Sequence, residues 1–211
     1  ICILLQTVPA ARSFIIHTSM SVDFSKIPSP CFVLEERLLR QNLQLIRNVM
    51  DEAECQIILA LKGFSMFSAF PIVKEYLPGA TASSLNEIRL INNYLGYQSH
   101  TYIPAYQDHE FDEVLVRSSH LTFNSLSQWE RFKERVNVFN EANPQKTISC
   151  GIRVNPQYSE VETDMYNPCV PGSRLGVTRD HFGEMLPEGI EGIHFHTLCE
   201  NGSDVLERTL E

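Results

Sequence analysis

The sequence has little that would point to a membrane, a nucleic acid or an oxidising compartment. No apolar run reaches membrane-spanning length, and the six cysteines are scattered without a C-x-x-C pair. Such cysteines do not resemble a zinc module or a secreted disulfide framework, and they fit buried thiols in a reducing cytoplasm. The 17 basic and 26 acidic residues give a net charge of −9. This charge argues against nucleic acid and anionic membranes as partners. We expect a cytoplasmic protein because no convincing export signal follows Met20.

A further absence narrows the fold class. No G-x-G-x-x-G motif follows any predicted strand, so a dinucleotide-binding fold lacks its main signal. Strand-like and helix-like segments instead alternate with short connections, which predicts a parallel sheet with right-handed crossovers. The predicted strands cover residues 31–34, 57–61, 80–82, 101–103, 121–123, 147–154 and 190–196. The predicted helices cover residues 36–51, 66–76, 86–95, 110–117, 127–140 and 204–210.

Six of these strands, from Ile57 to His196, are of the barrel type. We therefore expect an α/β fold with a partial (β/α)8 TIM-type barrel. A full barrel takes about 250 residues, and six strands alone would leave sheet edges exposed. We accordingly expect a fragment that lacks its C-terminal part. Within it, Ser127 and Glu130 have the spacing of a capping box at the start of the helix over residues 127–140.

Three segments are expected along the chain. The core-like pattern begins only after Met20, so residues 1–19 are predicted to be a translated leader outside the fold. The alternative is that this apolar stretch is the tail of a signal peptide. Residues 20–35 hold an N-terminal strand, and residues 36–211 hold the truncated barrel.

Lys62 directly follows an apolar run over residues 57–61, which is typical of a strand buried on both faces. The carboxyl end of such a strand is where α/β barrels keep their chemistry. An amine in a low-dielectric pocket readily loses its proton and becomes a nucleophile toward an aldehyde. The alternative is a strand cap whose side chain extends into solvent.

Two histidines lie two residues apart at the end of the last strand, so His194 and His196 share one face of it. One interpretation is a metal pair, with Cys199 or Glu200 as a further ligand. A second is an imidazole that stacks on, or hydrogen-bonds to, a flat cofactor. A third is a pair of ordinary core histidines.

Two arginines are also candidates. Arg153 lies inside an apolar strand, where a charge needs a carboxylate, a phosphate or water. Arg174 belongs to the turn-rich segment 167–177, which can present backbone N–H groups and a cation to an anion, or can be an ordinary surface loop. We take Arg174 as a substrate-loop candidate.

Together these segments resemble a known family, the fold-type III pyridoxal-phosphate decarboxylases, which have an alanine racemase-like barrel. Within it the sequence is most similar to the carboxynorspermidine (carboxyspermidine) decarboxylases. The resemblance covers about Ile27 to Glu211. It rests on the order of Pro28-Ser29-Pro30-Cys31-Phe32-Val33-Leu34, Ala60-Leu61-Lys62, Ala82-Ser83-Ser84-Leu85-Asn86-Glu87-Ile88, Thr122-Phe123-Asn124-Ser125, Ile152-Arg153-Val154-Asn155-Pro156, Asn167 to Gly176, and His194-Phe195-His196-Thr197-Leu198-Cys199-Glu200.

The resemblance implies roles for individual residues. Lys62 would form the Schiff base with pyridoxal phosphate, and His196 would stack on the pyridine ring. Arg153 would lie near the cofactor, and Glu87 matches a cofactor-site glutamate whose role is less defined. Cys199-Glu200-Asn201 departs from the Gly-Ser-Gly of ornithine decarboxylases, which puts a serine contact to the phosphate in doubt.

The implied reaction is decarboxylation of a small polyamine precursor, in which the cofactor ring takes up the electron pair left by CO₂. The family also implies a homodimer and a β-rich domain built from both chain ends, to which the strand over residues 31–34 would belong. Alternatives are a diaminopimelate or ornithine decarboxylase, a non-catalytic pyridoxal-phosphate protein, and a metal-dependent barrel hydrolase that uses His194 and His196.

Overall fold

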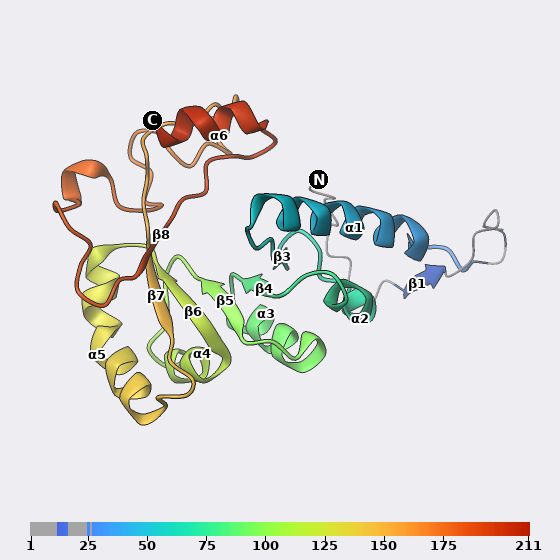
Figure 1. Cartoon of the computed structure of the whole chain (residues 1–211), viewed down its shortest axis with the longest axis horizontal. Coiled ribbons are helices and arrows are strands. Elements are labelled where there is room, and N and C mark those ends of the chain that lie inside the picture. The colour runs from blue at the N-terminus through green and yellow to red at the C-terminus, as the bar shows by residue number, and fades with distance from the viewer. Residues whose placement is uncertain (1–11, 17–24, 26) are drawn as a thin grey trace.

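The computed structural model describes residues 12–16, 25 and 27–211 (Figure 1). Met20, after which we expect the fold to start, lies outside the described residues. Six strands form one parallel sheet: β3 (Leu59–Ala60), β4 (Ala80–Ala82), β5 (Ser99–Tyr102), β6 (Ser118–Phe123), β7 (Ser149–Arg153) and β8 (Gly192–His194). The order in the sheet is the order in the chain, and every adjacent pair is parallel. The predicted α/β fold with a partial barrel is confirmed.

The helices are α1 (Glu36–Ala53), α2 (Phe70–Lys74), α3 (Leu85–Leu90), α4 (Phe111–Arg117), α5 (Leu126–Ala142) and α6 (Ser203–Leu210), with short 3-10 helices at Phe67–Ala69 and Arg179–His181 and a π-helical turn at Ile91–Leu95. Helices α1 to α5 precede or connect strands of the sheet, whereas α6 follows β8 and lies apart from the sheet (Figure 1). In the part of the chain that the structure describes, no helix is both long and apolar enough to cross a membrane.

Side chains on β5 alternate between the two faces of the sheet. Ser99 and Thr101 are buried, whereas His100 and Tyr102 are only partly buried and line a hollow on the inner face. Period-two alternation requires this arrangement in any strand. The buried hydroxyls of Ser99 and Thr101 hydrogen-bond to each other and to Ser118 of β6, whereas the rings of His100 and Tyr102 remain at the inner hollow.

An aromatic cluster fills the core between α4, α5 and β6. Phe111 and Phe132 stack with their ring centroids 4.1 Å apart, and Tyr106, Phe123 and Trp129 extend the cluster. All five side chains are almost completely buried. Burial of such rings removes a large apolar area from water, so this cluster holds the two helices against the sheet.

The predicted capping box is wrong, and the helix begins one residue earlier than expected. Ser125 is the N-cap of α5, and its side chain accepts a hydrogen bond from the backbone N–H of Gln128. The Gln128 side chain in turn accepts from the N–H of Asn124. The observed cap, formed by Ser125 and Gln128, has the same spacing as the predicted pair of Ser127 and Glu130. It lies two residues upstream of that pair.

A separate two-stranded parallel sheet joins β1 (Arg12–Ile16) to β2 (Cys31–Glu35). β2 corresponds to the predicted strand over residues 31–34, and β1 falls within the segment predicted as a leader. The three-part domain organisation stays a prediction.

Phe111→Ala is expected to lower the free energy of unfolding by about 3–5 kcal/mol, because it removes a fully buried ring and leaves a cavity in the aromatic cluster. Val138→Ala on α5, where the side chain is 56% exposed, is the control and should change stability by less than about 0.5 kcal/mol. Urea unfolding of the full-length protein measures both. Equal losses in the two variants would contradict the assignment of the core.

Candidate functional site

A hollow on the inner face of the sheet is lined by side chains from successive strands. They include Thr81 of β4, His100 and Tyr102 of β5, His120 and Thr122 of β6 and His194 of β8, and β7 contributes the backbone of Gly151. Because parallel strands in register end at the same edge, the residues at their carboxyl ends are brought together there. We call this edge the carboxyl edge. Lys62, Arg153 and His196 lie on or just after strands that end at it.

Arg153 is the last residue of β7 and is only 5% exposed. Its Nη1 donates a 2.7 Å hydrogen bond to the Tyr102 hydroxyl, and its guanidinium lies over the Tyr102 ring at 5.0 Å from the centroid. Its Nε is buried without a hydrogen-bond partner among the described residues. No carboxylate of the described chain pairs with it, so the guanidinium retains an unused donor and its charge.

Three rings form a loosely stacked row beside Arg153. The Tyr102 and His194 ring centroids are 5.3 Å apart, and those of His194 and His196 are 6.5 Å apart, with nearly parallel planes in both pairs. The Nε2 of His194 is buried and has no hydrogen-bond partner in the described part of the chain. His196 is exposed, so its ring face is accessible to a ligand.

Burial, together with the nearby charges of Arg153 and Lys62, lowers the pKa of His194 to about 4. Desolvation of the part of its ring that faces the protein, followed by the charges of Lys62 and Arg153, also lowers the pKa of His196. These two histidines are therefore neutral at physiological pH. Lys62 is exposed at the carboxyl end of β3, close enough for its charge to act on both imidazoles. The structure thus brings together Lys62, Arg153, His194 and His196.

The metal interpretation of the histidine pair has no further support. Among the residues that the structure describes, no group of three or more histidine, cysteine, aspartate or glutamate side chains is placed to hold a metal ion. Cys199 and Glu200, the further ligands considered from the sequence, are exposed in the turn after β8.

Glu87 lies in the first turn of α3, where its carboxylate has a local structural role. It accepts hydrogen bonds of 2.6 and 2.8 Å from the backbone N–H and the hydroxyl of Ser83. Ser84 is the N-cap of this helix and accepts from the Glu87 N–H. The carboxylate fixes the turn after β4, one strand away from Lys62.

Arg174 is exposed, but its backbone is firmly held. Its carbonyl accepts a 2.8 Å hydrogen bond from the side-chain amide of Asn124, which directly follows β6. Gly176 has φ +88°, and a Cβ atom there would lie 2.8 Å from the carbonyl carbon of Val154. Only glycine fits this close approach, so the chain from Arg174 to Gly176 is pressed onto the end of β7.

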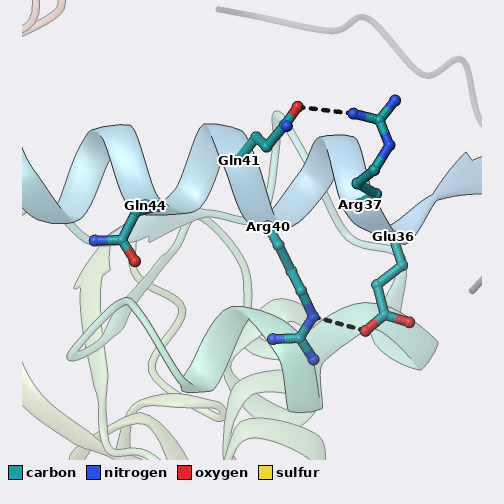
Figure 2. A pocket seen from close by; sticks show the side chains of 5 residues that line it. All are labelled: Glu36, Arg37, Arg40, Gln41 and Gln44. Carbon is teal, nitrogen blue, oxygen red and sulfur yellow. Dashed lines mark hydrogen bonds and ion pairs between the residues drawn. The ribbon is translucent and has the colours of Figure 1, made fainter. Parts of the chain in front are cut away.

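A second hollow lies along α1 and is lined by Glu36, Arg37, Arg40, Gln41 and Gln44 (Figure 2). Arg40 is bound by the carboxylate of Glu36 at 2.7 Å and by that of Glu75 at 2.6 Å. Because its central cation is already paired, this hollow is a solvated salt-bridge face, to which we assign no chemistry.

Sequence reasoning missed two residues of the carboxyl edge, Tyr102 and Asn124. Tyr102 fell inside a predicted strand, and Asn124 was noted only within a family motif. Both lie at or just after the carboxyl end of a barrel strand. That position alone could have identified them as candidate site residues.

Comparison with known proteins supports the predicted resemblance. The chain is 43% identical over 198 residues to the carboxyaminopropylagmatine decarboxylase of a Synechocystis species, covering 94% of this chain and 49% of the relative. It is 39% identical over 188 residues to a carboxynorspermidine/carboxyspermidine decarboxylase of Campylobacter jejuni, covering 89% and 47% of the two chains. The chain therefore spans about half the length of the curated relatives it matches. No protein-family model matches it.

A solved structure agrees. The carboxynorspermidine decarboxylase of Campylobacter jejuni, in complex with norspermidine, aligns with a TM-score of 0.71 and 36% identity, covering 87% of this chain and 45% of that one. The resemblance to the carboxynorspermidine and carboxyspermidine decarboxylases is thus confirmed.

The depressed pKa of His194 predicts a pH-dependent stability. Between its ordinary pKa of 6.5 and the folded value of about 4, the unfolded chain binds a proton that the folded chain does not. This contribution to stability is fully present above pH 6.5 and is lost as the pH falls toward 4. His194→Gln should therefore lose stability less steeply in this range, as measured by urea unfolding at several pH values. Parallel curves for parent and variant would contradict the burial of His194.

Proposed function

We propose that this chain forms the N-terminal part of the cofactor-binding barrel of a pyridoxal-phosphate-dependent decarboxylase that acts on carboxynorspermidine or carboxyspermidine. The observation that carries the proposal is the grouping of Lys62, Arg153, His194 and His196 at one edge of a barrel sheet. The similarity to decarboxylases at 39–43% identity supports it.

The residues at the carboxyl edge fit a flat, anionic aldehyde. Lys62 offers an amine, and the exposed His196 offers a ring face on which a pyridine can stack. Arg153 offers a buried guanidinium with an unused Nε donor, and His194 an imidazole with an unused Nε2. A negatively charged group would satisfy the arginine that no described carboxylate neutralises.

Each residue would have a distinct task. Lys62 would hold the cofactor at its aldehyde carbon, as a lysine amine does with carbonyl groups. His196 would fix the plane of the ring by stacking, and Arg153 would keep a positive potential beside it. Bound pyridoxal phosphate supplies the electron sink for the bond that breaks when CO₂ leaves. His194 and His196, whose pKa values are lowered, are neutral at physiological pH and contribute no charge to the binding of the anion.

Arg174 is proposed as a substrate-loop residue, because its exposed side chain extends from a loop that is fastened to the carboxyl edge. For Glu87 we propose a positioning role, since its carboxylate fixes the turn after β4 next to Lys62. We further propose that the full-length enzyme is a cytoplasmic homodimer with a β-rich domain to which β2 contributes.

A second substrate deserves equal testing. The relative at 43% identity is named for carboxyaminopropylagmatine, which the sequence reasoning did not consider. Comparing kcat/KM for carboxyaminopropylagmatine, carboxynorspermidine, carboxyspermidine, diaminopimelate and ornithine in the full-length enzyme would decide between these substrates. A preference for either of the last two would overturn the proposed substrate class.

Borohydride treatment of the full-length protein with pyridoxal phosphate should fix the cofactor on the peptide that contains Lys62. Lys62→Ala should remove the visible absorbance band and lower decarboxylation at least roughly a thousandfold, about 4 kcal/mol of transition-state stabilisation. Lys62→Arg is the matched control, because it keeps the positive charge but offers no amine to the aldehyde. Labelling of another lysine, or full activity of Lys62→Ala, would refute the proposal.

A further inference from the structure

A single phenol hydroxyl joins three strands at the carboxyl edge. Tyr102, on β5, accepts from the Nη1 of Arg153 on β7 at 2.7 Å. Its own hydrogen is donated to the Oδ1 of Asn124, after β6, at 2.8 Å. Burial raises the pKa of Tyr102 despite the nearby guanidinium, so the phenol keeps its proton. The hydrogen-bond chain therefore has a fixed direction, from Arg153 through Tyr102 to Asn124.

Asn124 continues this chain into the loop that carries Arg174. Its Oδ1 also accepts from the backbone N–H of Gly176 at 3.0 Å, and its Nδ2 donates to the carbonyl of Arg174 at 2.8 Å. One amide group thus binds the loop on both sides of Leu175. This orientation of the amide satisfies all three partners, whereas the flipped orientation would oppose acceptor to acceptor.

The loop is also bound to β7 through its backbone. The N–H of Val177 donates to the carbonyl of Arg153 at 2.9 Å, and the N–H of Asn155 donates to the carbonyl of Val177 at 2.8 Å. The loop and the buried arginine are therefore connected twice, once through the backbone and once through Tyr102 and Asn124. The backbone route holds Val177, and the side-chain route holds the stretch from Arg174 to Gly176.

We propose that Tyr102 and Asn124 are positioning residues that hold the Arg174 loop and the Arg153 guanidinium in one fixed arrangement. Neither residue needs to touch a reacting atom for this role. The Tyr102 ring supports Arg153 by a cation–π contact and His194 by stacking, while its hydroxyl transmits the position of Arg153 to the loop. The effect on cofactor binding rests on the proposed function, whereas the effect on the loop does not.

Tyr102→Phe separates the two functions of this side chain, because it keeps the ring and removes only the hydroxyl. Trypsin cleavage after the exposed Arg174 reports how often the loop opens. In the full-length protein we expect this cleavage to be about fivefold faster in Tyr102→Phe, because the variant loses the hydroxyl's hydrogen bond to Asn124, through which the loop is held. Tyr106→Phe is the matched control: its buried hydroxyl donates to the carbonyls of Thr101 and Thr122 and does not reach the loop.

Cleavage after Arg174 at the parent rate in Tyr102→Phe, or equal acceleration in Tyr106→Phe, would overturn the proposal. Asn124→Leu should accelerate cleavage more than Tyr102→Phe does, because it removes the two side-chain hydrogen bonds to the loop as well as the one from Tyr102. Mass spectrometry of the fragment that ends at Arg174 gives these rates without any cofactor.

A titration of the cofactor-free protein with pyridoxal phosphate supplies the second readout. Tyr102→Phe should raise the concentration for half-saturation about fivefold, and Tyr106→Phe should leave it unchanged. If the parent protein binds no pyridoxal phosphate, the proposed function fails while the trypsin result still decides the positioning role. If the parent binds it and Tyr102→Phe binds it equally well, the link from Tyr102 to Arg153 is overturned.

Discussion

The burial of Arg153 is the constraint around which the carboxyl edge is built. A guanidinium stays charged at every accessible pH, and a buried charge costs several kcal/mol unless polar groups surround it. The hydroxyl oxygen and the ring face of Tyr102 surround the Arg153 guanidinium, and no carboxylate of the described residues pairs with it. The arginine keeps its positive potential, and the same potential helps to keep His194 neutral. The charges of Arg153 and Lys62 thus act together on the two histidines of this edge.

The alternation of strands and helices was readable from the sequence because each element carries its own hydrophobic period. Where the elements end was less readable. The strand predicted over residues 57–61 pairs with its neighbour only at Leu59–Ala60. The neighbouring strand β4 is short, so the hydrogen-bonded pairing cannot extend further. The helix predicted over residues 66–76 is a 3-10 turn followed by five α-helical residues, with Pro71 in the first turn of the α-helix.

The residues of the candidate site were also only partly predictable from the sequence. Lys62, Arg153 and the two histidines were found because each interrupts or ends an apolar strand. Tyr102 and Asn124 were not assigned roles, because their importance comes from hydrogen bonds to residues 51 and 52 positions away in the chain. A single sequence shows chemistry at one position but not which distant groups share a hydrogen-bond chain. Similarly, the sequence did not show that the Glu87 carboxylate accepts hydrogen bonds from Ser83, and its role in the cofactor site stays a prediction.

The strands that border the inner hollow on one side carry glycines at paired positions, Gly151 on β7 and Gly192 on β8. A Cβ atom on Gly151 would lie 3.3 Å from the Gly192 carbonyl oxygen, whereas one on Gly192 would meet nothing within 4 Å. A larger side chain can therefore be placed beside His194 at Gly192 on β8, but not at Gly151 on β7 without a shift of the backbone. Side chains of increasing size at position 192 would act as graded spacers, so this position is a natural place for steric tuning of the pocket by evolution or by design.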